Sequence, residues 1–225
     1  MDRITGQSAK ARPKAFTLVE LLVVIAVLAM LLAVLMPTLA AAKKRAKVTA
    51  VNAELKQIAL ALETYAHNNA GRFPPTYVSC MIQSHFYQLP RELTEGQYLP
   101  AKRKKHGPMS SAFEDRCNPD HTYKYIAPGD LVQNGDSVRR NGSWLYVPDG
   151  FPHNEKETGE YYNKPRESPV KYVVYSVGPN YDPEDEEVQN LRFPIPRKTW
   201  YDPSADKGAI VRIRLDNMKY TGSFE

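Results

Sequence analysis

A single carboxylate lies at the start of the longest apolar run in the chain. Glu20 is the one charged residue between Phe16 and Ala42, and sixteen consecutive apolar residues, Leu21–Met36, follow it. A carboxylate inside a membrane segment is costly and usually has a functional partner. Glu20 is therefore the first candidate for a functional residue.

Acidic residues near the C-terminus form a second group of candidates. An acidic run at 182–187 follows the segment Ser176-Val177-Gly178, and a further aspartate comes later in the chain. Hard cations such as calcium take several oxygen ligands from loops of this kind. The candidate calcium ligands are Asp182, Glu184, Asp185 and Asp202. A solvated acidic loop is the alternative.

The two cysteines, Cys80 and Cys117, bracket a segment without clear periodicity. A disulfide between them would stabilise the fold by about 3 to 4 kcal/mol in the chain-entropy model, and an oxidising compartment such as the periplasm permits it. Each cysteine is followed by a histidine, His85 or His121, so zinc is an alternative. These spacings match no established zinc pattern.

Other chemistry finds little support. The basic run Lys102–His106 could contact phosphate, but few aromatic residues interleave with it, and a solvated loop is favoured over nucleic-acid binding. The five histidines are scattered, and the chain has no phosphate loop, nucleophile elbow or metalloprotease helix. We therefore expect a protein that is not an enzyme.

The apolar run predicts a helix that crosses a membrane, since about 20 mostly apolar residues are enough to span a bilayer. A cleaved secretory signal would use the alanines at 40–42, and a plain signal anchor would keep the whole segment. Neither interpretation explains Glu20.

A third interpretation explains it. The stretch from Lys14 to Ile25, Lys-Ala-Phe-Thr-Leu-Val-Glu-Leu-Leu-Val-Val-Ile, resembles the cleavage and methylation signature of type IV prepilins and type II secretion pseudopilins. The resemblance implies that a prepilin peptidase cuts between Ala15 and Phe16 and that Phe16 is then N-methylated. It also implies that Glu20 pairs with the N-terminal ammonium of a neighbouring subunit, which supplies the cation that a buried carboxylate needs.

Two further residues bear on this resemblance. Pro37 lies where many pilins carry a helix-kinking proline. Ala15 departs from the glycine that usually precedes the cut, so slower processing is a consequence to test.

Charge does not decide the orientation of the helix. Cytoplasmic flanks favour Lys and Arg, but four such residues precede the apolar run and four follow it, namely Lys43, Lys44, Arg45 and Lys47. A cytoplasmic N-terminus is therefore implied by the resemblance alone. Without the first fifteen residues the net charge falls from +5 to +2, so no strongly basic partner surface is required.

The helix is predicted to continue beyond the membrane. Apolar residues recur at spacings of 3 and 4, at Val48, Val51, Leu55, Ile58, Leu62 and Tyr65. This stripe predicts packing on the protein's own sheet, with Lys47, Glu54, Lys56 and Glu63 on the opposite face. Asn68, Asn69 and Gly71 predict its end, and Pro74-Pro75 prevent continuation.

The remaining chain predicts an α+β head, with a small antiparallel sheet laid on the helix stripe. Strands are expected at 122–126, 143–147, 170–177 and 209–215, and a variable loop at 76–120. The helix exit at 65–74 and the Ser176-Val177-Gly178 segment resemble those of major pseudopilins, which implies a calcium-binding loop. Ala209 stands where such tails often carry an aspartate.

The sequence thus divides into a leader at 1–15, a transmembrane and filament-core helix at 16–42, its amphipathic continuation at 43–70, and a periplasmic head at 71–225. The resemblance implies a structural subunit of a type II secretion pseudopilus or related filament. Its expected partners are copies of itself, minor pseudopilins, a prepilin peptidase and an inner-membrane assembly platform. The alternatives are a type IV pilus subunit for adhesion or DNA uptake, and a signal-anchored periplasmic protein that does not polymerise.

Overall fold

The computed structural model describes residues 17–78, 87–102, 110–111, 113–133, 137–181 and 195–224. The chain divides into two compact units, Met1–Arg45 and Ala46–Glu225. The predicted leader, with Ala15 and Phe16, lies outside the described residues.

One helix, α1, runs from Leu18 to Asn68 and contains Pro37 in its interior. Its C-terminal end is a left-handed turn, in which Ala70 adopts a φ of 55° and the Gly71 N–H donates to the carbonyl of Ala66 at 2.8 Å. This is the Schellman arrangement, which satisfies a carbonyl that would otherwise lack a partner at the helix end. The predicted stop is confirmed, although an alanine takes the left-handed position that glycine usually fills.

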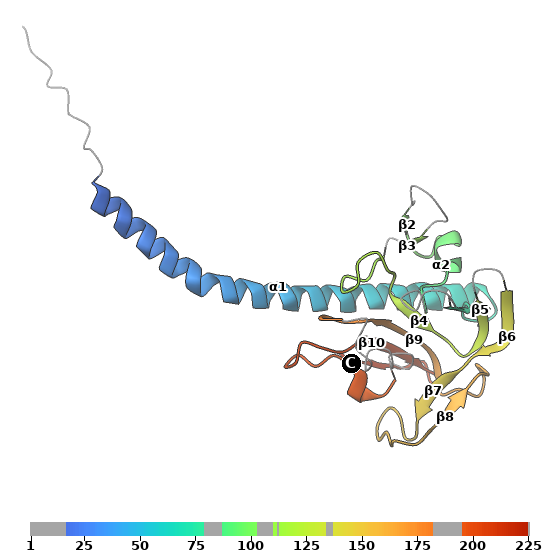
Figure 1. Cartoon of the computed structure of the whole chain (residues 1–225). Helices are drawn as coiled ribbons and strands as arrows, with labels where there is room; N and C mark the ends of the chain where they lie inside the picture. The colour runs from blue at the N-terminus through green and yellow to red at the C-terminus, as the bar shows by residue number, and fades with distance from the viewer. Residues whose placement is uncertain are drawn as a thin grey trace, which may run out of the picture. The chain divides into compact units, whose positions relative to one another are not determined.

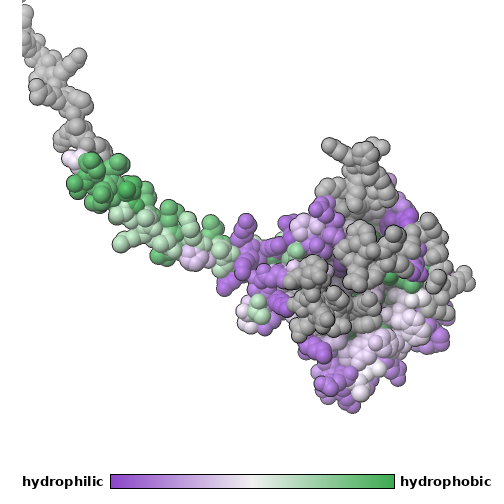
Figure 2. Space-filling model, in the orientation of Figure 1, coloured by the Kyte–Doolittle hydropathy of each residue, from purple (hydrophilic) through white to green (hydrophobic). Residues whose placement is uncertain are grey.

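The N-terminal half of α1 is apolar on all sides. Its large hydrophobic residues from Leu18 to Leu39 are between 48% and 82% exposed. By length and composition, α1 is apolar enough to cross a membrane. Figure 2 shows the apolar colouring gathered on this half of the helix. Such a surface is stable only in lipid or against other apolar helices.

The unit from Ala46 onward contains the C-terminal part of α1 and the head, and the head holds a four-stranded antiparallel sheet in the order β11-β10-β9-β4 and a three-stranded sheet in the order β1-β5-β6. Their bounds are β1 Thr76–Val78, β4 Lys124–Ile126, β5 Gly129–Gln133, β6 Ser137–Ser143, β9 Val170–Ser176, β10 Ile210–Leu215 and β11 Tyr220–Gly222. The pair β1 and β5 is parallel, and the other pairs are antiparallel. A long helix with antiparallel sheets confirms the predicted α+β fold.

Smaller elements complete the head (Figure 1). They are the helix α2 Glu92–Glu95, the short strands β2 Ala101–Lys102 and β3 Ser110–Ser111, the ribbon of β7 Leu145–Pro148 and β8 Gly159–Tyr162, and the 3-10 helix η3 Arg197–Thr199. The strand expected at 143–147 is divided, because β6 ends at Ser143 and β7 begins at Leu145.

The sheet is buried on both faces. Tyr172 and Val174 of β9 pack in the cluster that contains the α1 stripe, whereas Val173 and Tyr175 pack in a second cluster with Leu145 of the ribbon. Successive side chains of a strand point to opposite faces, so β9 is the middle layer between α1 and the ribbon. This explains why β9 reads as a continuous apolar run rather than an alternating one.

Candidate functional site

Glu20 takes part in a capping box at the start of α1. Its Oε2 accepts hydrogen bonds from the backbone N–H of Thr17 at 2.9 Å and from the Thr17 hydroxyl at 2.8 Å, and Thr17 Oγ1 accepts from the Glu20 N–H at 3.2 Å. This reciprocal pair satisfies backbone donors that lack partners in the first turn. The signal Thr-x-x-Glu was readable in the sequence. Among the described residues, only Oε2 of the carboxylate has a partner.

Pro37 creates a local gap in the hydrogen bonding of α1. It has no N–H, so the carbonyl of Ala33 loses its helical donor. One residue on, the Thr38 hydroxyl donates to the carbonyl of Leu35 at 2.8 Å. The helix is therefore weaker here than in its flanking turns, at the place where the sequence predicted a kink.

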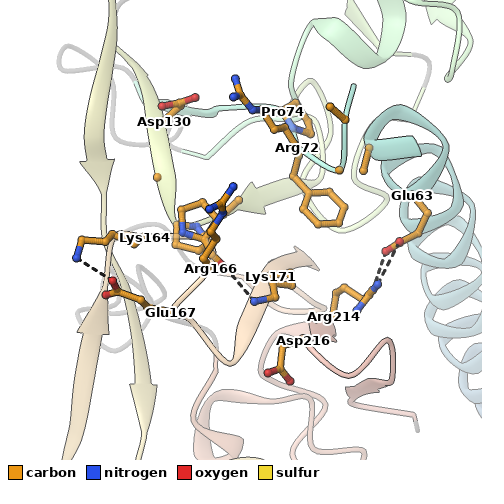
Figure 3. Close-up of a pocket in the computed structure, with 18 of the residues that line it drawn as sticks. Glu63, Arg72, Pro74, Asp130, Lys164, Arg166, Glu167, Lys171, Arg214 and Asp216 are labelled. Atoms are coloured by element: carbon orange, nitrogen blue, oxygen red, sulfur yellow. Dashed lines mark hydrogen bonds and ion pairs between the residues drawn. The ribbon is translucent and has the colours of Figure 1, made fainter. Parts of the chain in front are cut away.

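Two glutamates of α1 anchor the head to the helix. Glu63 Oε1 accepts from Arg214 Nε at 2.9 Å, from the Tyr220 hydroxyl at 2.9 Å and from the Tyr172 hydroxyl at 3.1 Å. Figure 3 shows Arg214 extending from the sheet to Glu63. Three donors from β9, β10 and β11 thus converge on one carboxylate oxygen of α1.

Glu54, nine residues earlier, makes a second such contact. It accepts from Arg116 Nε at 2.8 Å and from the hydroxyl of Tyr123, a tyrosine with no exposed surface. The prediction that Glu54 and Glu63 face away from the sheet is therefore wrong. Both flank the apolar stripe closely enough for their carboxylates to reach hydroxyl and guanidinium groups at the sheet's margin. Lys47 and Lys56 are exposed, as predicted.

A buried carboxylate supports the loop that follows β9. Asp115 is 1% exposed, and its Oδ1 accepts from the Ser176 hydroxyl at 2.7 Å and the Cys117 N–H at 2.8 Å. Its Oδ2 accepts from the Val177 N–H at 3.0 Å. Burial raises the pKa of this carboxyl group. Burial also lowers the pKa of the neighbouring Lys124 to about 8. No local sequence pattern marks either residue.

The predicted calcium ligands are only partly described. Asp202 is exposed, and its Oδ1 accepts from the Ser204 N–H at 2.8 Å and hydroxyl at 2.7 Å. Nearby, Asn180 Nδ2 donates to the carbonyl of Asp206 at 2.9 Å. The described residues contain no group of three acidic, histidine or cysteine side chains that could hold a metal. The ligands Asp182, Glu184 and Asp185 lie outside the described residues, so calcium stays a prediction.

The disulfide also stays a prediction. Cys117 is half-buried, and burial raises the pKa of its thiol. Its expected partner, Cys80, lies outside the described residues.

A polar cleft of about 1070 Å³ opens at the C-terminal end of α1. Several of its charges have partners within the head. Lys164 pairs with Glu167 at 2.8 Å, and Lys171 Nζ donates to the carbonyl of Pro165 at 2.9 Å (Figure 3). Lys171 Nζ also donates to the carbonyl of Ser168 at 2.8 Å. Among the residues that the structure describes, those that line the cleft include no serine, threonine or cysteine.

An apolar helix that begins with a capping box containing a glutamate and is followed by an α+β head defines the class of type IV pilin-like proteins. Residues 10–36 match the family described as the prokaryotic N-terminal methylation motif. This match and the apolar helix fit a membrane-anchored pilin-like protein. The motif includes Ala15 and Phe16 by position, but cleavage and methylation themselves remain predictions.

Two characterised relatives refine the class. The chain is 31% identical to type II secretion system core protein G of Pseudomonas aeruginosa over 139 residues, which is 60% of this chain and 91% of that protein. The chain belongs to the family of this core protein, and it is a pilin-like structural subunit. It is also 52% identical over 56 residues to the type IV wide pilus major component PilA4 of Thermus thermophilus, which is 25% of this chain and less than half of that protein, 43%. No solved structure matches the chain.

Proposed function

We propose that this chain is the major subunit of a type II secretion pseudopilus and has no enzymatic role. The observation that supports this proposal is the extent of the similarity to core protein G, which covers 91% of that protein. An alignment of this extent includes more than a membrane helix. The similarity to the pilus component PilA4 covers 56 residues.

Assembly begins with processing. A prepilin peptidase removes residues 1–15, and Phe16 becomes the methylated N-terminal residue. Thr17 already holds Glu20 through Oε2. Oε1 then accepts the N-terminal ammonium of the neighbouring subunit, so that the buried carboxylate is neutralised and the axial register of the filament is set.

The apolar half of α1 supplies the filament core. Its exposed side chains lie in lipid before assembly and against the helices of other subunits afterwards. An inner-membrane assembly platform moves each subunit between these two environments, with the head on the periplasmic side. The weakened turn around Pro37 lets the helix adapt to its neighbours.

The test combines the mass of the mature N-terminus with filament yield after shearing. We expect a chain that starts at methylated Phe16, and a large loss of filaments in Glu20→Ala. Glu160→Ala, which removes an exposed glutamate of the head, is the matched control and should assemble normally. A chain that starts after Ala42, or full filament yield in Glu20→Ala, would contradict the proposal.

A type IV pilus subunit is the second candidate, and the 52% identity to PilA4 favours it. Both candidates assemble from the membrane, so filament formation does not separate them. Affinity purification of the assembled filament does: secretion-channel components support the pseudopilus, and pilus retraction components support the pilus. A signal-anchored protein that never polymerises would give no filament under any condition.

A further inference from the structure

Three cations follow the apolar half of α1 without a gap. Lys43, Lys44 and Arg45 come directly after Ala42, belong to the same helix and are exposed. Figure 2 shows the colouring of α1 change from apolar to polar beyond the apolar half. Under the proposed orientation these cations lie on the exported side, where membrane proteins generally carry fewer lysines and arginines. Their presence there needs a physical reason.

The length of the helix sets their depth. Glu20 keeps the start of the hydrocarbon core close to Leu21, because a carboxylate is costly inside it. An α-helix rises 1.5 Å per residue, so Lys43 lies about 33 Å beyond Leu21 along the axis. The hydrocarbon core is about 30 Å thick, and the headgroup layers bring the bilayer to about 40 to 45 Å. The three cations therefore lie at the level of the lipid phosphates.

Their angular spread fits a surface that surrounds the helix. Consecutive helical residues are about 100° apart, so three of them cover roughly 200° of the circumference. A protein partner that docks on one side of α1 would meet one or two of these side chains. A headgroup layer meets all three, and long Lys and Arg side chains place their charges at such an interface readily.

We infer that Lys43, Lys44 and Arg45 bind anionic phospholipid headgroups and fix the depth of the subunit in the membrane before assembly. Each cation near an anionic surface strengthens binding by roughly fivefold. The guanidinium of Arg45 can also hold a phosphate through two parallel hydrogen bonds. Extraction of the subunit must then break these contacts. The inference rests on the proposed function for its orientation and for the extraction step.

The test uses the full-length protein in nanodiscs of mixed phosphatidylglycerol and phosphatidylcholine, with the co-released lipids identified by native mass spectrometry. We expect the wild type to retain phosphatidylglycerol over phosphatidylcholine by about tenfold or more, and the variant K43Q/K44Q/R45Q to retain them about equally. The control K102Q/R103Q/K104Q removes three cations from the head and should keep the preference. Far-UV circular dichroism verifies that α1 is intact in both variants.

Two results overturn the inference: a wild type with no lipid preference, or a triple variant that keeps it. Raising the salt concentration from 50 to 500 mM should weaken the wild-type preference, because added salt screens headgroup contacts at the surface. The Debye length is about 10 Å at 0.1 M and becomes shorter as the salt concentration rises. The readout needs no filament. A lipid preference without filament formation contradicts the proposed function alone, whereas filaments without a preference contradict this inference alone.

Discussion

Replacing Glu63 by alanine should weaken the attachment of the sheet to α1 and destabilise the head. The substitution removes the acceptor for Arg214, Tyr172 and Tyr220 at once. These donors come from three strands, so the carboxylate holds β9, β10 and β11 against the helix. Its loss leaves the packing of the apolar stripe and the contacts of Glu54 with Arg116 and Tyr123 as the remaining attachments.

The magnitude follows from the burial of the partners. Removing one member of a buried ion pair costs about 3 to 5 kcal/mol. The Glu63 side chain is 32% exposed, which reduces its interaction with the 9% exposed side chain of Arg214. The two tyrosine hydroxyls also lie within 3.1 Å of each other and can pair after the change. We therefore expect a loss of about 2 to 3 kcal/mol in the free energy of unfolding.

The assay is thermal unfolding of the full-length protein in mild detergent, followed by near-UV circular dichroism of its tyrosines. A domain of this size loses about 2 to 4 °C in Tm per kcal/mol, so Glu63→Ala should lower Tm by about 5 to 10 °C. Glu63→Gln keeps an acceptor oxygen, so its Tm should lie between those of the wild type and Glu63→Ala. Gln57→Ala, at an exposed position of the same helix, is the control. If Glu63→Ala and Gln57→Ala shift Tm equally, the contact contributes nothing and the reasoning fails.

Three further predictions concern the head. Gly178→Ala should prevent stable folding, because Gly178 has a φ of +81° and a Cβ there would lie 1.8 Å from the Gly208 carbonyl oxygen. The control Gly71→Ala places its Cβ within 4 Å of no atom and should cost much less stability. Equal melting temperatures of the two variants would contradict this prediction. Burial lowers the pKa of Lys124 to about 8 from 10.5, so between these pH values the unfolded chain binds more protons than the folded one. The free energy of unfolding should therefore rise with pH in this range, by about 3 kcal/mol relative to Lys124→Met. A difference between the two proteins that does not change with pH would contradict this prediction. If the acidic loop binds calcium, millimolar calcium should raise Tm and a chelator should reverse the rise. Asp202→Asn should make the calcium-dependent rise in Tm smaller. A Tm that does not change when calcium is added would refute the site.

The sequence predicted the parts of the fold that depend on local spacing. The stripe from Val48 to Leu62 is buried as predicted, because a 3-4 spacing places one face of a helix against whatever covers it. The anchoring role of Glu63 could not be predicted in this way, because Tyr172 and Arg214 lie more than a hundred residues away in the chain. A helical pattern identifies the centre of the buried face but not the reach of the polar residues beside it.

The same distinction holds for the candidate site. Glu20 stood out because a carboxylate beside sixteen apolar residues has few structural explanations. Asp115 did not stand out, since an aspartate in a loop is ordinary until its burial and its bonds to Ser176 and Val177 are seen. A sequence reveals that a carboxylate is energetically unfavourable only when the apolar residues around it are consecutive in the chain, as they are around Glu20. Ser176 and Val177 are distant from Asp115 in the chain, so its burial is not visible in the sequence.

The carboxylates in the two halves of α1 differ in the partners that compensate their charge. Glu54 and Glu63 accept hydrogen bonds from the guanidinium groups of Arg116 and Arg214, so cations of the same subunit compensate their charge. Glu20 receives only the Thr17 donors on one oxygen, in a segment that offers no cation of its own. In an apolar environment a carboxylate held this way is stabilised further by any cation that reaches its second oxygen. In the described part of the head these carboxylates thus have cations of their own, whereas under the proposed function the cation for Glu20 comes from a neighbouring subunit.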